Sequence, residues 1–237
     1  MRRFHLLPLL LVLLLGACST TLPARGPVAP GTYHLNLDKD AKDWSRSALV
    51  HVPPRLADAP VPLLVALHGA FSTGAKMAEE TGFSRLADRA GFIVAYPQGI
   101  GIFGLLQHWN AGFCCGKAEA DDWDDVGTVL RLVEYLAARL PVDRSRVYLV
   151  GMSNGGMLAY RLAAEHPERF AAVAVVSGAI GSSEAGVERY RLPVPARPVP
   201  VLIIHGRDDD HVPYDGGVSP AKGGDRSYPP VAAATAF

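Results

Sequence analysis

The sequence has little charge and few cysteines. Charged residues make up 19% of the 237 residues, and 23 basic side chains balance 23 acidic ones. Zero formal net charge gives no broad attraction to polyanions, which argues against nucleic-acid binding. Hydrophobic residues make up 49% of the chain, and this content excludes a disordered chain. The length suits one domain with a sizeable core.

Only three cysteines are present, Cys18, Cys114 and Cys115. There is no Cys-x-x-Cys spacing and no second pair of metal ligands, so we expect neither a zinc site nor a cofactor. Three states are open to the adjacent Cys114 and Cys115. They could form a vicinal disulfide, pair with cysteines of another chain, or remain thiols.

The N-terminus resembles an export signal. Arg2 and Arg3 precede an apolar run over 6–15, which is too short to span a bilayer comfortably. Small residues follow in Leu15-Gly16-Ala17-Cys18, which resembles the lipobox of bacterial lipoproteins.

We therefore expect a lipoprotein-type signal peptide over 1–17 and a tether over 18–32. Lipid on Cys18 would then anchor the exported protein to a membrane. An ordinary signal followed by a chance cysteine is the alternative, and it would give a secreted or periplasmic protein.

The remaining residues, 33–237, alternate between strand and helix patterns. Near-continuous apolar runs, typical of strands covered on both faces, lie at 62–68, 92–96, 146–150, 171–176 and 200–205. Helical patterns lie between them at 75–90, 126–140 and 155–166, and alternating segments at 33–37 and 48–52 predict an antiparallel pair at a sheet edge. This order predicts an α/β domain whose mostly parallel sheet has helices on both faces. In such sheets, active sites lie at the carboxyl ends of the strands.

The strongest chemical signal is Gly151-Met152-Ser153-Asn154-Gly155. It follows the predicted strand 146–150 and opens the predicted helix 155–166. A serine nucleophile needs a sharp strand-to-helix turn that presents its hydroxyl above the sheet, and flanking glycines allow that turn. Ser153 is therefore the candidate nucleophile, and a glycine-rich helix start is the alternative.

Such a serine also needs hydrogen-bond donors for the developing oxyanion. The backbone N–H of Asn154 lies at the predicted helix N-terminus. A second donor should come from the loop after 62–68, where Gly69 would let the backbone of Ala70 approach the substrate carbonyl. We expect His68 to brace this loop, because it precedes the nucleophile and the usual chain order is Ser, acid, His.

An acidic run, Asp208-Asp209-Asp210, follows the last predicted strand. A buried carboxylate there would hold a catalytic imidazole in the right tautomer. A solvated acidic turn is the alternative for each aspartate. A calcium loop is less favoured, since no further spaced oxygen ligands occur.

Four ordered motifs together resemble the secreted poly(3-hydroxybutyrate) depolymerases and feruloyl esterases. They are Trp109-Asn110-Ala111-Gly112-Phe113-Cys114-Cys115-Gly116, Asp124-Asp125-Val126-Gly127, GMSNGGM from Gly151, and His205-Gly206-x-x-Asp209 with Val212-Pro213-Tyr214. The resemblance runs from about Ala57 to the last residue. It implies an α/β-hydrolase fold and a serine esterase that acts on hydroxyalkanoate oligomers or on feruloyl or acetyl esters of plant polysaccharide.

The resemblance also assigns roles by motif position. It makes Ser153 the nucleophile, Asp209 rather than its neighbours the acid, and the amides of Ala70 and Asn154 the oxyanion hole. Trp109 and Asn110 match the family at the rim of the site, and they are the candidate substrate-binding residues.

One departure concerns the catalytic histidine. The family places it in a Gly-His-x-Trp segment well downstream of the acid, whereas His211 alone follows Asp209 here. Two residues beyond the acid on the same turn, His211 could hardly stand between Asp209 and Ser153. We therefore expect an α/β-hydrolase domain incomplete at its C-terminus, without the usual last strands and helix, in which 228–237 begins a helix.

Two alternatives to the esterase remain. One is a peptidase or lactone hydrolase, because fold alone does not choose the chemistry. The other is a truncated lipoprotein without activity that kept the nucleophile turn. The apolar residues of 98–109 either line an acyl or aromatic pocket or form a small buried flap.

Overall fold

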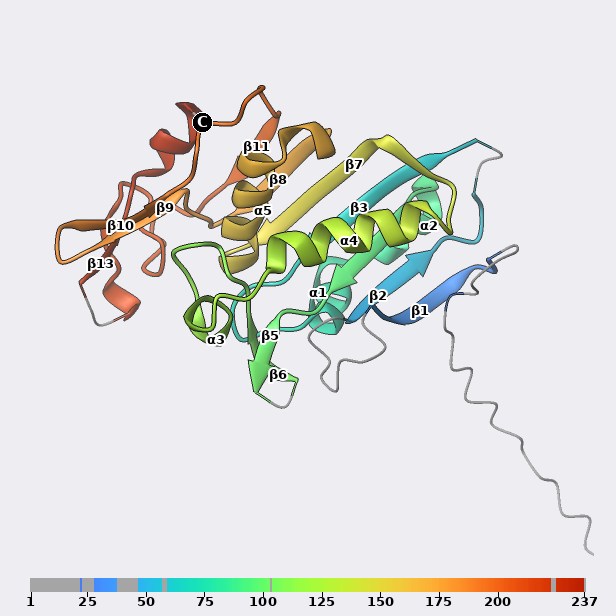
Figure 1. Ribbon diagram of the computed structural model, residues 1–237, viewed down its shortest axis with the longest axis horizontal. Coiled ribbons are helices and arrows are strands. Elements are labelled where there is room, and N and C mark those ends of the chain that lie inside the picture. Colours follow the sequence, from blue (N-terminus) through green and yellow to red (C-terminus); the bar gives the residue numbers. More distant parts are fainter. Residues whose placement is uncertain are drawn as a thin grey trace, which may run out of the picture.

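The computed structural model describes residues 22, 28–37, 47–56, 59–102, 104–222 and 225–236 (Figure 1). The expected signal peptide, Cys18 and most of the tether lie outside the described residues. In the part of the chain that is described, no helix has the length and apolar character needed to cross a membrane.

A seven-stranded sheet forms the centre of the fold, in the order β1-β2-β4-β3-β7-β8-β11 (Figure 1). Its strands are β1 (Gly31–Asn36), β2 (Ser47–Val52), β3 (Val61–Leu67), β4 (Ile93–Pro97), β7 (Val142–Met152), β8 (Ala172–Val176) and β11 (Val201–Ile204). β1 pairs with β2, and β2 with β4, in antiparallel register, whereas β4, β3, β7, β8 and β11 are parallel neighbours. The predicted parallel sheet and its antiparallel edge pair are both confirmed.

Five α-helices occur in the described chain: α1 (Gly74–Thr81), α2 (Phe83–Ala90), α3 (Gly116–Ala120), α4 (Asp125–Ala137) and α5 (Asn154–Glu165). The expected single helix over 75–90 is divided into α1 and α2, because Gly82 adopts a left-handed conformation, with φ 64°, that ends α1. Asp124 caps α4 by accepting a hydrogen bond from the backbone N–H of Gly127.

The helices cover both faces of the sheet, as predicted (Figure 1). On β3, Leu63, Val65 and Leu67 pack in the core cluster that contains the apolar residues of α4 and α5. Leu64 and Ala66 point to the other face, where Ala66 packs with Met77 of α1 and Ala87 of α2. This two-sided burial explains why the strand is a continuous apolar run.

Two smaller antiparallel units were not predicted. A hairpin of β5 (Ile100–Ile102) and β6 (Leu105–His108) follows β4 and projects from the body (Figure 1). A four-stranded sheet contains β9 (Gly181–Glu184), β10 (Val187–Arg191), β12 (Gly217–Val218) and β13 (Arg226–Tyr228). In the described residues, short 3-10 helices cover Pro167–Arg169, Pro220–Lys222 and Val231–Ala236. We expected an α-helix to begin within 228–237. The described part of this segment instead contains the end of β13 and a 3-10 helix, so that prediction is wrong.

Candidate active site

Ser153 lies on the turn between β7 and α5, at the carboxyl edge of the sheet. Its backbone has φ 51° and ψ −118°, which is rare for a residue other than glycine. Neighbouring glycines make the turn possible. A Cβ on Gly151 would lie 2.2 Å from the carbonyl oxygen of Gly155, and one on Gly155 would lie 2.4 Å from that of His68. The predicted strand–turn–helix context of Ser153 is therefore confirmed.

The loop after β3 lies directly against this turn. A Cβ placed on Gly69 would be 3.7 Å from the Cβ of Ser153 and 3.5 Å from the carbonyl oxygen of Met152. Ala70, the next residue, is half-buried. Asn154 is the first residue of α5, where backbone N–H groups have no partner within the helix. The structure thus brings Ala70 and Asn154 to the same side of the sheet edge as Ser153.

His68 braces the Ala70 loop through both ring nitrogens, as expected. Nε2 accepts a hydrogen bond of 3.1 Å from the backbone N–H of Gly99, so Nδ1 carries the proton and donates to the carbonyl of Gly69 at 2.8 Å. The ring is fully buried. Burial lowers the pKa of His68 to about 4, which keeps the imidazole neutral at physiological pH.

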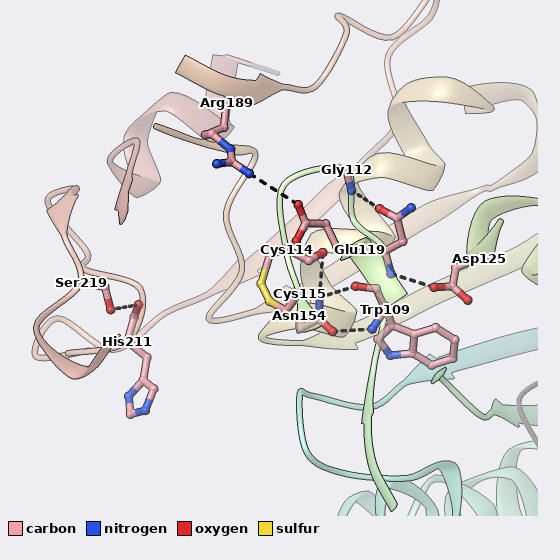
Figure 2. Close-up of a disulfide and its surroundings, with 11 residues drawn as sticks. Trp109, Gly112, Cys114, Cys115, Glu119, Asp125, Asn154, Arg189, His211 and Ser219 are labelled. Atoms are coloured by element: carbon pink, nitrogen blue, oxygen red, sulfur yellow. Dashed lines mark hydrogen bonds and ion pairs between the residues drawn. A yellow bond between two sulfur atoms is a disulfide. The ribbon is translucent and has the colours of Figure 1, made fainter. Parts of the chain in front are cut away.

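Trp109 and Asn154 connect this loop to α5. The side-chain amide of Asn154 accepts from the backbone N–H of Trp109 at 2.7 Å and donates to its carbonyl at 2.9 Å (Figure 2). The Trp109 indole N–H donates to the carbonyl of His68 at 2.8 Å. Trp109 is 0% exposed in this structure, and its predicted contact with substrate stays a prediction. A large aromatic ring is more stable inside the fold, and this one packs on His68.

Asn110 is also buried, and its predicted contact with substrate likewise stays a prediction. Its backbone N–H donates to the carboxylate of Asp125 at 2.7 Å, and its side-chain carbonyl accepts from the N–H of Gly112 at 2.9 Å. The side-chain N–H donates to Asp122 and to the carbonyl of Trp123. These hydrogen bonds occupy the polar groups of Asn110 and hold the segment between β6 and α3 on α4.

Cys114 and Cys115 form a vicinal disulfide (Figure 2). Both are buried, and they pack with Phe113 and Met157 in a small apolar cluster. The carbonyl of Cys114 accepts from the Asn154 side chain at 3.3 Å. Of the three states that the sequence left open, the structure contains the disulfide.

Asp209 follows β11, and its carboxylate is held by backbone groups of its own turn. One oxygen accepts hydrogen bonds of 2.9 Å from the N–H groups of His211 and Val212. Burial by itself would raise the pKa of Asp209, but these N–H groups and the Ser177 hydroxyl stabilise the anion and hold the pKa below its usual range. Asp208 is exposed, so the structure distinguishes Asp209 from its neighbour.

The strand order sets the spacing of Asp209 and Ser153. Ser153 follows β7, Asp209 follows β11, and β8 lies between these strands. Two strand spacings amount to about 10 Å, which leaves room for an imidazole between the carboxylate and the hydroxyl. Among the described residues, however, no histidine ring nitrogen lies within hydrogen-bonding distance of the Ser153 hydroxyl.

His211 and His205 both lie at the Asp209 turn, and neither has the geometry of a base. The His211 ring is exposed and pairs with Asp210 at 2.7 Å, so only its backbone N–H contacts Asp209. His205 is a buried brace that sequence reasoning missed. Its Nε2–H donates to the carbonyl of Val212 at 2.7 Å and lies 3.5 Å from Asp209. One feature of the sequence indicates this role: His205 comes immediately after β11, at the edge of the sheet where the site lies.

Asp209, Asp210 and His211 also place one possible metal-ligand atom each within 4.8 Å of one another. Asp210 and His211 are exposed, and their side chains form an ion pair. The Asp209 carboxylate accepts hydrogen bonds from backbone N–H groups. In these contacts the turn holds the Asp209 carboxylate through its own backbone N–H groups.

The sheet order, the helices on both faces and the serine turn define an α/β-hydrolase. A family model described as "Esterase PHB depolymerase" matches residues 46–212, and the chain belongs to this family. The fold is also similar to that of the solved acetyl xylan esterase from Aspergillus awamori, with a TM-score of 0.50 and 24% identity over 63% of this chain and 52% of that one.

Two curated relatives are similar in sequence. The putative esterase NocK of Nocardia uniformis subsp. tsuyamanensis is 36% identical over 73% of this chain and 47% of its own length. Feruloyl esterase B of Neurospora crassa is 35% identical over 57% of this chain and 45% of its own length. The chain therefore spans less than half the length of either relative.

Proposed function

We propose that the protein hydrolyses carboxylic esters through an acyl-enzyme on Ser153. The observation that carries this proposal is the strained turn of Ser153, packed against Gly69 at the centre of the carboxyl edge. Glycine would adopt this positive-φ conformation at lower cost than serine. The packing of the turn therefore does not explain why residue 153 is a serine. Strain of this kind is characteristic of functional sites. Membership of an esterase family supports the same reading.

In the proposed reaction, the Ser153 hydroxyl attacks the ester carbonyl and gives its proton to a base. The backbone N–H groups of Ala70 and Asn154 stabilise the negative charge on the carbonyl oxygen. The alcohol then leaves with a proton, and water hydrolyses the resulting acyl-enzyme to the free acid and Ser153. Asp209, kept ionised by its backbone donors, orients and stabilises the protonated base. We propose that this base is a histidine, as the family resemblance implies.

The proposed substrates are hydroxyalkanoate oligomers or feruloyl or acetyl esters of plant polysaccharide. The family description names a polyester, one relative is named a feruloyl esterase, and the solved neighbour is named an acetyl xylan esterase. We further propose that the protein is exported and anchored to a membrane by lipid on Cys18. The signal-like run and the small residues before Cys18 support this placement.

The test is hydrolysis of a soluble p-nitrophenyl ester by the product of the complete gene. Ser153→Ala should lower kcat at least 10³-fold. Ser145→Ala is the control, because Ser145 is an exposed serine near the other end of the same strand, β7, and activity should be unchanged. A p-nitroanilide of the same acid should be a much poorer substrate. Full activity in Ser153→Ala would disprove the proposal, and preference for the anilide would indicate a peptidase.

A further inference from the structure

The Cys114–Cys115 disulfide packs against both α5 and the turn after β11. The two cysteines share an apolar cluster with Met157 of α5 and Val212 of that turn. Cys114 is 0% exposed and Cys115 is 7% exposed. Both side chains are therefore enclosed by other groups of the fold, and any effect of the disulfide on the site passes through those groups.

The first of these groups is the start of α5. The carbonyl of Cys114 accepts a hydrogen bond of 3.3 Å from the side chain of Asn154, the first residue of the helix (Figure 2). Met157, one turn further along α5, donates its backbone N–H to the carbonyl of Ser153 at 2.9 Å. The disulfide loop thus contacts the helix turn that follows the nucleophile through a backbone carbonyl and through an apolar side chain.

The second group is the turn that carries Asp209. Val212 donates its backbone N–H to the Asp209 carboxylate at 2.9 Å, and its carbonyl accepts from His205 at 2.7 Å. This turn follows β11, which pairs with β8 and is the last strand in the order of the described seven-stranded sheet. An edge strand is held by the sheet on one side, so the packing of Val212 with the cysteines gives the turn a second support.

The covalent bond between the two sulfur atoms saves room in this cluster. Non-bonded heavy atoms stay about 3.5–4 Å apart, so two thiols need more space than a bonded pair of sulfur atoms. Protein interiors are close-packed and have little space to spare. Breaking the bond would therefore move the backbone at 114–115, and with it the acceptor of the Asn154 side chain, or displace Met157 and Val212.

We propose that the Cys114–Cys115 disulfide is a positioning element, which fixes the start of α5 and the Asp209 turn relative to one another. The inference rests on the proposed function, because these two elements carry the nucleophile and the acid of that reaction. Neither cysteine takes part in the chemistry. Loss of the bond would misalign Ser153, Asn154 and Asp209 around a bound ester, so the effect falls on kcat more than on KM.

The test uses the product of the complete gene and a soluble p-nitrophenyl ester. Cys114→Ser with Cys115→Ser removes the bond and keeps side chains of similar size. The control is Val52→Ala, which truncates a buried side chain at the end of β2 farthest from the carboxyl edge, where the adjacent His51 pairs with Val94 of β4. The double variant should have a kcat at least tenfold lower and a KM within twofold of the parent. Val52→Ala should match the parent in both.

Reduction gives a second route to the same comparison if the double variant does not fold. Dithiothreitol passes two electrons and two protons to the disulfide of the folded parent, which becomes two thiols, and the reagent leaves as a cyclic disulfide. The reduced parent should show the same fall in kcat, and reoxidation should restore it.

Amide hydrogen exchange separates this proposal from the proposed function, because exchange does not depend on turnover. Relative to α4, peptides over 150–158 and 207–214 should exchange at least tenfold faster without the bond, and at the parental rate in Val52→Ala. Parental kcat or parental exchange without the bond, an equal loss of kcat in Val52→Ala, or a rise in KM alone would each overturn the proposal. If Ser153 proves not to be catalytic while both segments still exchange faster, the proposed function fails and the positioning role remains.

Discussion

The Asn154 side chain and the Trp109 backbone form two hydrogen bonds, one in each direction, of 2.7 and 2.9 Å. Since Trp109 in turn donates to the carbonyl of His68, a continuous set of buried contacts runs from the start of α5 to the loop that carries Ala70. The two backbone N–H groups proposed as the oxyanion hole are therefore positioned by one network. Their relative position depends on the buried side chains of Asn154 and Trp109.

Asn154→Ala should disturb this network. It leaves the N–H of Trp109 buried without its partner, whereas the Trp109 carbonyl keeps the hydrogen bond from the N–H of Cys115. The loss costs about 1–3 kcal/mol of unfolding free energy. We expect kcat to fall at least tenfold with a smaller change in KM, because the oxyanion donors are displaced. Urea unfolding and ester kinetics measure both effects.

Trp109→Phe is the matched, smaller change, because it retains the aromatic ring and removes one hydrogen bond, the one to His68. It should lower stability by about 1–2 kcal/mol and kcat less than Asn154→Ala does. Stable variants with unaltered kcat would show that the network supports the fold without positioning the loop.

Asp209 and Asp208 should differ strongly as sites of substitution. Asp209→Asn removes the charge that stabilises a protonated base, and kcat should fall by about 10²–10⁴-fold. Asp208→Asn changes an exposed carboxylate and should leave kcat within about twofold. Ester kinetics at pH 7 measure kcat for both variants. Similar losses of kcat in the two would show that the acid is wrongly assigned.

His68 should make stability depend on pH. Its folded-state pKa is about 4, against an ordinary value of 6.5. Below pH 6.5 the unfolded chain takes up a proton that the folded protein binds only near pH 4. The free energy of unfolding therefore falls as the pH drops through this window, by about 2 kcal/mol between pH 7 and pH 5.

The His68 contribution is measured by urea unfolding at pH 7 and pH 5. His68→Gln retains an acceptor for the Gly99 N–H. In this variant the difference in unfolding free energy between pH 7 and pH 5 should be smaller by about 2 kcal/mol. His34→Gln, at an exposed position on β1, should keep the full difference. The same pH dependence in His68→Gln as in the parent protein would contradict the assignment.

Cys18 should decide where the protein is found. If it carries lipid, the product of the complete gene fractionates with membranes in a bacterial host, and Cys18→Ser moves it to the soluble exported fraction. Cell fractionation and the mass of the N-terminal peptide measure this. A Cys18→Ser protein that still sediments with membranes would refute the anchor.

Local pattern and motif spacing predicted much of the fold and the chemical centre. Continuous apolar runs identified the parallel strands, because burial on both faces leaves a clear composition signal. The serine turn was recognised because its strand, glycines and helix are contiguous in sequence. The hairpin β5–β6 and the sheet of β9, β10, β12 and β13 were missed, since short exposed strands carry little periodicity.

The rest of the site depends on contacts between distant segments. Trp109 was assigned to the rim from its motif, but its position is set by hydrogen bonds to His68 and Asn154, which are 41 and 45 residues away. His205 was not recognised as a support for Asp209, because its partner Val212 becomes a neighbour only when the turn folds. Such roles follow from three-dimensional geometry, which sequence spacing does not encode.

The most direct test of the central claim is labelling of the product of the complete gene with a fluorophosphonate, followed by peptide mass spectrometry. We expect one phosphonyl group per chain, on Ser153, with loss of the label in Ser153→Ala and retention in Ser145→Ala. Labelling of another residue, or ester turnover without any label on Ser153, would contradict it.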